Sequence, residues 1–475
     1  MDDLYGQTCD RCGGFSNAVE HRITFSPDAL DKGLHDILSG FDVKNDIQRD
    51  IFRETLRLFN RAAARGISES YDEKAITDEF LEQIRHNNEV FSVFKTHKMQ
   101  NEIARHLLDG DGRLKSYEQF RRDVAPLTGK YCGQWLNTEY NTAVIRAHRA
   151  ADWKHFEGEK DIYPRLKWLK TTSATPDPIH RRFWEQNLVL DVEAPFWRDH
   201  QPGERWGCKC SCEQTDEPAN DPFGVSGGNG VRTSSKGLAG NPAETGKLFS
   251  EDHPYYPENC SACPFNRGVK NRLRAFFNKK KDCSTCTSIG NVIRRENAIY
   301  DIGESLVKLY DLNKEDFGKE VRRIASSKMF KRVGKSIFSA IGQEDNDYDR
   351  LLAVARKASI KGYTSFILPN PSRGRTPDII LSRNGVFKVY DVKTIVGKNS
   401  VSSRLADSVG QTHRVILHIT TDYNPREMAK EIKKFLNKNP NAVEVLVFRG
   451  NKQISVTPNM LTHGFEKAFV SRYNR

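Results

Sequence analysis

The spacing of apolar residues changes along this chain, and that change constrains the fold more than any other feature. Between residues 46 and 153, apolar side chains recur every three to four positions among charged ones, the spacing that buries one face of an α-helix. After residue 347, short apolar runs of strand length alternate with helical segments. The sequence therefore predicts a multi-domain chain, with a mostly α-helical (α+β) region first and an α/β domain with a mixed sheet last.

The helical region is expected to contain three long helices, at residues 46–64, 72–109 and 117–153. Gly66, Gly110 and Gly129 stand where such helices would stop. After residue 163 the helical spacing is lost, and aromatic residues are dense up to residue 212.

The last domain is expected to form a sheet flanked by helices. Asn384–Gly385 separates two β-rich runs and predicts a tight hairpin between them. The predicted strands are 364–369, 377–382, 386–395, 414–420, 443–450 and 453–457, and the predicted helices are 347–360, 402–411 and 425–436.

The composition excludes two classes of protein. No run approaches the roughly 20 apolar residues of a membrane-spanning helix, and 37% hydrophobic with 10% aromatic residues is too rich in core-forming side chains for a disordered chain. The first residues lack the basic and apolar stretches of a Sec signal. We expect a soluble protein that is not Sec-secreted and has no membrane partner. Its net charge of +12 is compatible with nucleic acid but does not require it.

Composition along the chain predicts five parts. The stretch 216–248 is rich in Gly, Pro, Ser and Asn and is expected to be a flexible linker. It follows a helical domain at 1–215 and precedes a cysteine-bearing segment at 249–290. A basic helical connector at 291–340 would lead into the last domain at 341–475.

Four cysteines are spaced as in structural zinc sites. Cys260 and Cys263 form one C-x2-C pair, and Cys283 and Cys286 form another, with 19 residues between the pairs. Such pairs present four thiolates to one tetrahedral ion. The segment is too short to build its own core, so bound Zn²⁺ would supply its folding energy. The alternative is two unrelated buried pairs.

A second candidate metal site rests on weaker spacing. Cys208, Cys210 and Cys212 alternate, so an extended backbone would point all three thiols the same way. His180, His200 and the distant Cys9/Cys12 pair are candidate co-ligands. The alternative is tight packing of a turn-rich region.

The stretch 168–211 resembles the signature of the phage head-morphogenesis, or minor head protein, family. The similarity covers residues 46–213 and implies a few copies near the portal of a procapsid, with no accepted catalytic site. His180 would then be a core or metal-fixing residue. The residues that carry the resemblance are Trp168, Asp177, His180, Arg181, Pro202, Cys208 and Cys210.

Two acids and a lysine in the last domain predict phosphodiester chemistry. Asp378 begins one strand, Asp391 and Lys393 share a face of the next, and the Asn384–Gly385 hairpin brings them together. Paired carboxylates suit Mg²⁺, and the ammonium can stabilise a pentavalent transition state. This is the PD-(D/E)xK nuclease arrangement, in which a helix acid completes the site; Asp349 is the candidate, with Glu344 and Asp347 behind it. The alternative is a solvated hairpin.

The segment 347–456 contains a helix ending in Lys361-Gly362-Tyr363, the strands with Asp378 and with Asp391 and Lys393, and a predicted helix with Ser400, Arg404-Leu405 and Gln411. In these features it resembles the C-terminal toxin nucleases of contact-dependent growth inhibition proteins. The resemblance implies an RNase, most often acting on tRNA, or a DNase, with an immunity protein as partner. A metal-independent, barnase- or colicin-like RNase is a second route, in which Lys393, Thr394, His413 or Arg414 would do the acid–base and phosphate work. The candidate substrate-binding residues are Arg375, Thr394, Arg404, Gln411, His413 and Arg414.

These observations favour a phage or prophage minor head protein with a C-terminal nuclease domain, acting on RNA (tRNA) in preference to DNA. Portal and capsid proteins would be its partners, and the virion, the procapsid or the host cytoplasm its location. The competing hypothesis is a purely structural capsid protein whose last domain only binds nucleic acid or a partner.

Overall fold

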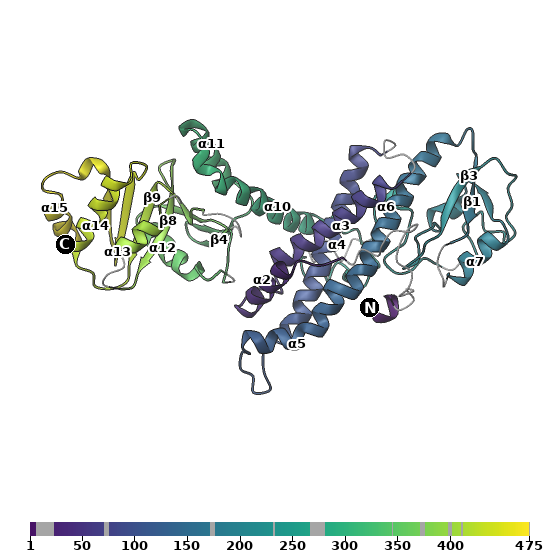
Figure 1. Ribbon diagram of the computed structural model, residues 1–475, viewed down its shortest axis with the longest axis horizontal. Helices are drawn as coiled ribbons and strands as arrows, with labels where there is room; N and C mark the ends of the chain where they lie inside the picture. Colours follow the sequence, from purple (N-terminus) through teal and green to yellow (C-terminus); the bar gives the residue numbers. More distant parts are fainter. Residues whose placement is uncertain are drawn as a thin grey trace. The chain divides into compact units, whose positions relative to one another are not determined.

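The computed structural model separates the chain into two compact units, Met1–Ile293 and Arg294–Arg475. The first is mostly helical and the second contains a mixed sheet (Figure 1), so the predicted order of these two architectures is confirmed. No helix among the described residues is long and apolar enough to cross a membrane. The structure describes residues 1–5, 23–70, 76–171, 176–230, 233–266, 281–343, 345–370, 376–397, 401–409 and 412–474.

Long helices dominate the first unit, and α3, α4 and α6 lie side by side (Figure 1). A π-helical turn at Lys130–Gln134 joins α5 to α6, so the helix expected at 117–153 is two helices in near continuity. The helices are α1 (Asp2–Tyr5), α2 (Pro27–Leu38), α3 (Arg49–Ser68), α4 (Asp78–Ala104), α5 (Tyr117–Gly129) and α6 (Trp135–Glu159).

Gly66 does not end a helix, as its residue type suggests, but lies inside α3. A Cβ at this position would stand 2.2 Å from the carbonyl oxygen of Val144 and 2.9 Å from the Cβ of Ala147. Both residues belong to α6, so glycine here permits the two helices to approach closely.

A small antiparallel sheet completes the first unit, in the order β2–β1–β3. Its strands are β1 (Arg165–Leu169), β2 (Val189–Asp191) and β3 (Ser211–Thr215). Helix α7 (Pro178–Glu185) begins at Asp177, whose side chain accepts hydrogen bonds from the first turn. A 3₁₀ turn follows at Pro195–Arg198. The aromatic-rich segment of the sequence therefore forms this sheet and its cover.

The segment expected to be a flexible linker is packed into this unit instead. Leu238 and Leu248 are fully buried in the core, and residues Pro242–Thr245 form a short helix, α8. The buried guanidinium of Arg146 on α6 donates hydrogen bonds to the carbonyl oxygens of Leu238 and Gly240, both at 3.0 Å. Composition could not indicate this packing, because hydrogen bonds to backbone carbonyl groups hold the segment, and every residue type has such a group.

The second unit is built on an eight-stranded mixed sheet, in the order β11-β10-β9-β8-β7-β6-β5-β4. The pairs β5–β6, β8–β9 and β9–β10 are parallel and the others antiparallel. The strands are β4 (Lys331–Gly334), β5 (Ile337–Ser339), β6 (Thr364–Ile367), β7 (Ile379–Arg383), β8 (Val386–Ile395), β9 (Arg414–Ile419), β10 (Glu444–Arg449) and β11 (Lys452–Val456).

The connector expected to be helical to its end is helical only in part. Its last residues form β4 and β5, which extend the sheet. These strands were not predicted, because both are short and lie within a stretch rich in basic residues. The helices of this region are α10 (Thr287–Val307), a 3₁₀ turn at Leu309–Asp311 and α11 (Lys314–Ala325).

The predicted hairpin between β7 and β8 is confirmed, since Asn384 and Gly385 both have positive φ, at 53° and 75°. One face of the sheet packs against α12 (Tyr348–Ile360). The other face carries two separate cores, one with α10 and α11 and one with α13 (Val401–Asp407), α14 (Pro425–Lys438) and α15 (Phe465–Asn474).

The two outermost strands of the sheet, β4 and β11, differ in their surroundings. In β4 the first three residues, including Lys331 and Arg332, are exposed. At the other end of the sheet, α15 covers β11, and the ammonium of Lys452 donates a hydrogen bond of 3.2 Å to the carbonyl oxygen of Tyr473.

Gly66→Ala should destabilise the first unit by about 1–3 kcal/mol, because the added methyl group forces α3 away from α6. Gly158→Ala is the matched control: it lies in α6, a Cβ there meets nothing within 4 Å, and alanine should leave stability unchanged or raise it slightly. Urea denaturation followed by circular dichroism measures both. Equal effects of the two substitutions would contradict the close approach.

Candidate functional site

Asp378, Asp391 and Lys393 lie together on one face of the large sheet. Asp378 directly precedes β7, and its backbone N–H donates a 3.0 Å hydrogen bond to the carbonyl oxygen of Tyr390 on β8. Ile379 pairs with Tyr390, so Asp378 stands across from Asp391. The ammonium of Lys393 lies 3.1 Å from Oδ1 and 3.0 Å from Oδ2 of Asp391. The expected hairpin therefore brings all three side chains together.

The carboxyl groups of Asp378 and Asp391 are close enough for the charge of Asp391 to act on the pKa of Asp378. Burial raises the pKa of Asp378 well above its ordinary value, and the negative charge of Asp391 raises it further. The backbone N–H of Val392 donates to Oδ2 of Asp378 at 2.6 Å, which opposes that shift. Asp391 is only 2% exposed. One lysine therefore faces one buried carboxyl group, that of Asp391, and one half-buried carboxyl group, that of Asp378.

The pair lies on this face of the sheet between two apolar cores, and this position explains how the fold accommodates its polar groups. On the same face of β7 and β8, Ile380 and Val389 belong to the core beneath α10 and α11, whereas Ile395 belongs to the core beneath α13 and α14. Asp391 and Lys393 fall between these two apolar cores.

Tyr310 and His413 neighbour the pair; His413 was predicted from the sequence as a site residue, and Tyr310 was not. Tyr310, in the 3₁₀ turn after α10, is close enough to Asp391 for that charge to act on its phenol. Burial raises the pKa of Tyr310 to about 12, with a smaller contribution from the charge of Asp391. The imidazole of His413 packs 4.7 Å from the Tyr310 ring, and burial lowers the pKa of His413. Tyr310 precedes Asp391 by 81 positions, so no local spacing links them.

The other predicted site residues are not brought to the pair. Asp349 is exposed in the first turn of α12, which covers the opposite face of the sheet. By strand alternation Thr394 and Arg414 also belong to that opposite face. Arg404 is exposed on α13 and pairs with Asp407 at 3.8 Å. Arg375, Gln411 and Glu344 lie outside the described residues.

Arg414 instead takes part in a second buried polar cluster, centred on Glu444. Its guanidinium Nε lies 3.4 Å from the Glu444 carboxylate. The carboxylate also accepts hydrogen bonds from Lys388 at 2.8 Å, from the Tyr390 hydroxyl at 3.1 Å and from the Ser455 hydroxyl at 2.7 Å. Its charge is thus compensated, in contrast to that of the Asp378–Asp391 pair.

The two groups of cysteines differ in geometry. Among the described residues, three donors that lie within 4.8 Å of one another are provided by His180, Cys208 and Cys210. Cys212 is buried but stands outside that group.

The four cysteines of the C-x2-C pairs do not form such a group of three, among the residues that the structure describes. Cys260 and Cys283 each accept a backbone hydrogen bond from the second cysteine of their pair, at 3.4 and 3.3 Å. Burial raises the pKa of Cys263, and the neighbouring thiols Cys286 and Cys260 raise it further, so the pairs lie near one another.

Both units are similar to known proteins. Residues 375–454 match the family "Contact-dependent growth inhibition CdiA C-terminal domain". The N-terminal region is similar to the "Putative capsid assembly protein F" of Escherichia phage Mu, with 24% identity over 189 residues. That alignment covers 34% of this chain and 42% of the phage protein, so the chain spans less than half of its relative's length. No solved structure matches the chain.

Asp378→Asn should stabilise the second unit by about 1–2 kcal/mol at pH 7, because it removes a buried repulsion and keeps an acceptor for Val392 N–H. The folded-state pKa of Asp378 is raised, so the wild-type chain loses stability as the pH rises from the unfolded pKa toward the folded one. The gain should therefore vanish below about pH 4 and grow toward neutrality.

Thermal denaturation of both proteins between pH 4 and pH 8 measures this difference. The control is Asp349→Asn, which changes the same charge at an exposed position and should shift stability by less than about 0.5 kcal/mol. A gain that does not depend on pH would contradict the raised pKa.

Proposed function

We propose that this chain is a phage or prophage head protein whose C-terminal unit is a toxin-like nuclease that cleaves RNA in preference to DNA. The observation that carries the proposal is the Asp378–Asp391–Lys393 cluster. All three residues lie within the segment that matches the CdiA C-terminal family, whose members act as nucleases.

The donors at this site fit a divalent cation such as Mg²⁺. One buried and one half-buried carboxyl group face one ammonium, and desolvation together with the negative charge of Asp391 raises the pKa of Asp378. Asp378 and Asp391 would hold the ion, which when bound supplies Lewis-acid activation of a phosphate oxygen or a water. Lys393, held by Asp391 at 3.0 Å, would stabilise negative charge that develops on the phosphoryl oxygens.

The metal-independent route would use fewer residues than the sequence suggested. Thr394 and Arg414 belong to the opposite face, so acid–base work would fall to His413 beside Tyr310, with Lys393 contacting phosphate. The lowered pKa of His413 leaves its imidazole neutral at pH 7, as a general base requires.

The first unit supports the head-protein half of the proposal. Its similarity to a capsid assembly protein favours capsid and portal proteins as partners and a procapsid, virion or host-cytoplasm location. An immunity protein that blocks the nuclease in the producing cell would be a further partner. The segment with Cys260, Cys263, Cys283 and Cys286 would bind a structural Zn²⁺ once the two pairs close around the ion.

The nuclease proposal predicts that the purified full-length chain degrades RNA in the presence of Mg²⁺. Asp391→Asn and Lys393→Met should each lower the rate at least about 100-fold, because each removes a group aimed at the reacting phosphate. Gel electrophoresis of end-labelled tRNA, mixed RNA and duplex DNA measures rate and substrate preference together.

Lys388→Met is the matched control for Lys393→Met. It removes the same charge from the same strand, but Lys388 pairs with Glu444 on the opposite face, so the rate should change less than about threefold. Cleavage that persists in EDTA and is lost in His413→Ala would contradict the metal-dependent mechanism. Absence of cleavage on every nucleic acid would contradict the nuclease itself.

A further inference from the structure

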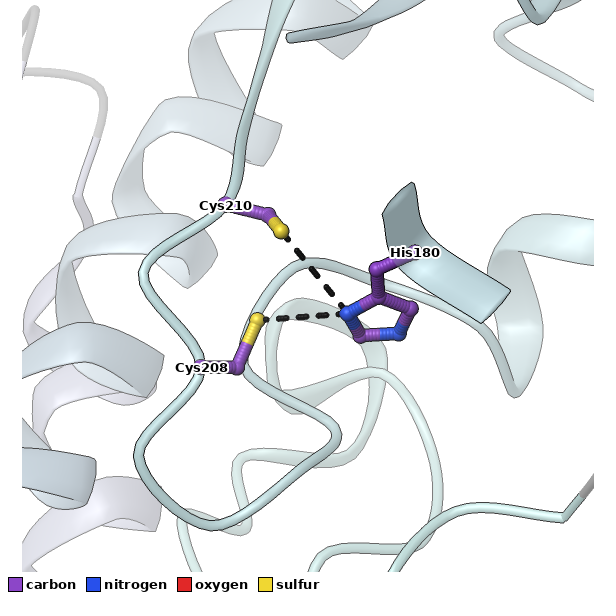
Figure 2. Close-up of side chains that lie close together, drawn as sticks. All are labelled: His180, Cys208 and Cys210. Carbon is purple, nitrogen blue, oxygen red and sulfur yellow. Dashed lines mark hydrogen bonds between the residues drawn. The ribbon is translucent and has the colours of Figure 1, made fainter. Parts of the chain in front are cut away.

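We propose that His180, Cys208 and Cys210 form a zinc-binding centre in the first unit, independent of the nuclease site. Figure 2 shows both thiols pointing at the same ring nitrogen. Cys208 Sγ lies 3.5 Å and Cys210 Sγ lies 3.7 Å from Nδ1 of His180, and the three donor atoms all lie within 4.8 Å of one another. Two thiolates and one imidazole are ligands that Zn²⁺ prefers, at bond lengths near 2.0–2.3 Å.

The opposite nitrogen of His180 is held as in known metal centres. Nε2 of His180 lies 3.1 Å from one oxygen of Glu204, and Nδ1 of His200 lies 3.0 Å from the other. A carboxylate that accepts the Nε2–H bond leaves the lone pair of Nδ1 free to face the sulfurs. Glu204 is itself buried and lies 3.3 Å from the Arg205 guanidinium, so this orienting group is fixed.

The backbone brings the donors from separate segments. His180 lies in the first turn of α7, where the Asp177 side chain accepts hydrogen bonds from the backbone N–H groups of Ile179 and His180. Cys208 and Cys210 come from the loop that precedes β3. A bound ion would therefore fasten α7 to the loop that enters β3, in addition to the packing of Phe183 of α7 against Trp168 of β1.

Cys212 is excluded, although alternation in the sequence groups it with the other two thiols. Strand β3 begins only at Ser211, so Cys208 and Cys210 lie in a loop, where alternation does not apply. Cys212 pairs with Trp168 across β1 and β3 and stands outside the donor group.

A nucleophilic Cys208–His180–Glu204 triad is the main alternative reading of these contacts. Burial argues against it, because Cys208 is 8%, His180 1% and Glu204 2% exposed, which leaves substrate little access to the sulfur. A second thiol at the same nitrogen is also unnecessary for a nucleophile but is expected of a metal centre.

The test is the zinc content of the full-length chain, purified without chelators and measured by mass spectrometry of the metal. The parent is a Cys260→Ser/Cys283→Ser double variant, which takes one cysteine from each of the two C-x2-C pairs between residues 260 and 286. It should carry about one zinc per chain. Cys208→Ser and His180→Asn should lower this at least tenfold, and Cys212→Ser, an equally buried thiol on the neighbouring strand, should leave it unchanged.

A second measurement needs no substitution, in case the variants fail to fold. Chelation of the wild-type chain should expose Cys208 and Cys210 to alkylation together, as read by peptide mass spectrometry, and re-added Zn²⁺ should protect both. A metal-free parent, zinc retained in Cys208→Ser, a Cys208–Cys210 disulfide, or alkylation unaffected by chelation would each overturn the proposal. Loss of nuclease activity alone bears on the other site, not on this one.

Discussion

The buried ion pair between Lys95 and Glu139 is the interaction on which the first unit depends. Their side chains are 2% and 0% exposed, and the ammonium lies 2.6 Å from the carboxylate. The hydroxyls of Tyr5 and Tyr255 donate to the second carboxylate oxygen at 2.8 and 2.7 Å. The pair thus ties α4 and α6 to α1 and to the segment after residue 250. Removal of one partner would leave a buried charge uncompensated, which typically costs about 3–5 kcal/mol.

The second unit handles buried charge in the opposite way. Glu444 is surrounded by two cations and two hydroxyls, yet Asp378 and Asp391 share one lysine between them. A fold selected only for stability would not leave two carboxyl groups together in a low-dielectric setting. Two neighbouring acids, one of them with a strongly raised pKa, are typical of sites that bind cations or transfer protons, and this distinguishes the Asp378–Asp391 pair from the Glu444 cluster.

The sequence predicted the hairpin between β7 and β8 correctly, because local rules determine its turn and register. Asn384 and Gly385 specify the turn, the turn sets the register, and the register places Asp378 opposite Asp391. Contacts between distant residues escaped prediction. The proximity of Tyr310 to Asp391 depends on how a helical segment packs on the sheet, and neither composition nor spacing records that packing.

The contrast between local rules and distant contacts also explains where the first unit differs from what its sequence predicted. Gly66 is a helix breaker by propensity, but its close approach to Val144 depends on a second helix. The composition around Gly240 is typical of a flexible loop, but Arg146 donates a hydrogen bond to the backbone carbonyl oxygen of Gly240. Composition does not indicate a contact of this kind. Alternation grouped three cysteines because it assumed a strand that begins later, at Ser211. The first two differences come from a partner far along the chain, and the third from the position at which the strand begins.

The exposed, charged edge strand β4 has a consequence for how identical chains can associate. An open sheet edge offers unpaired N–H and C=O groups to any neighbouring strand, and identical chains at high local concentration are the readiest partners. Exposed Lys331 and Arg332 make two such edges repel each other, while α15 covers the opposite edge at β11. The fold thereby protects itself against edge-to-edge polymerisation without giving up the open sheet.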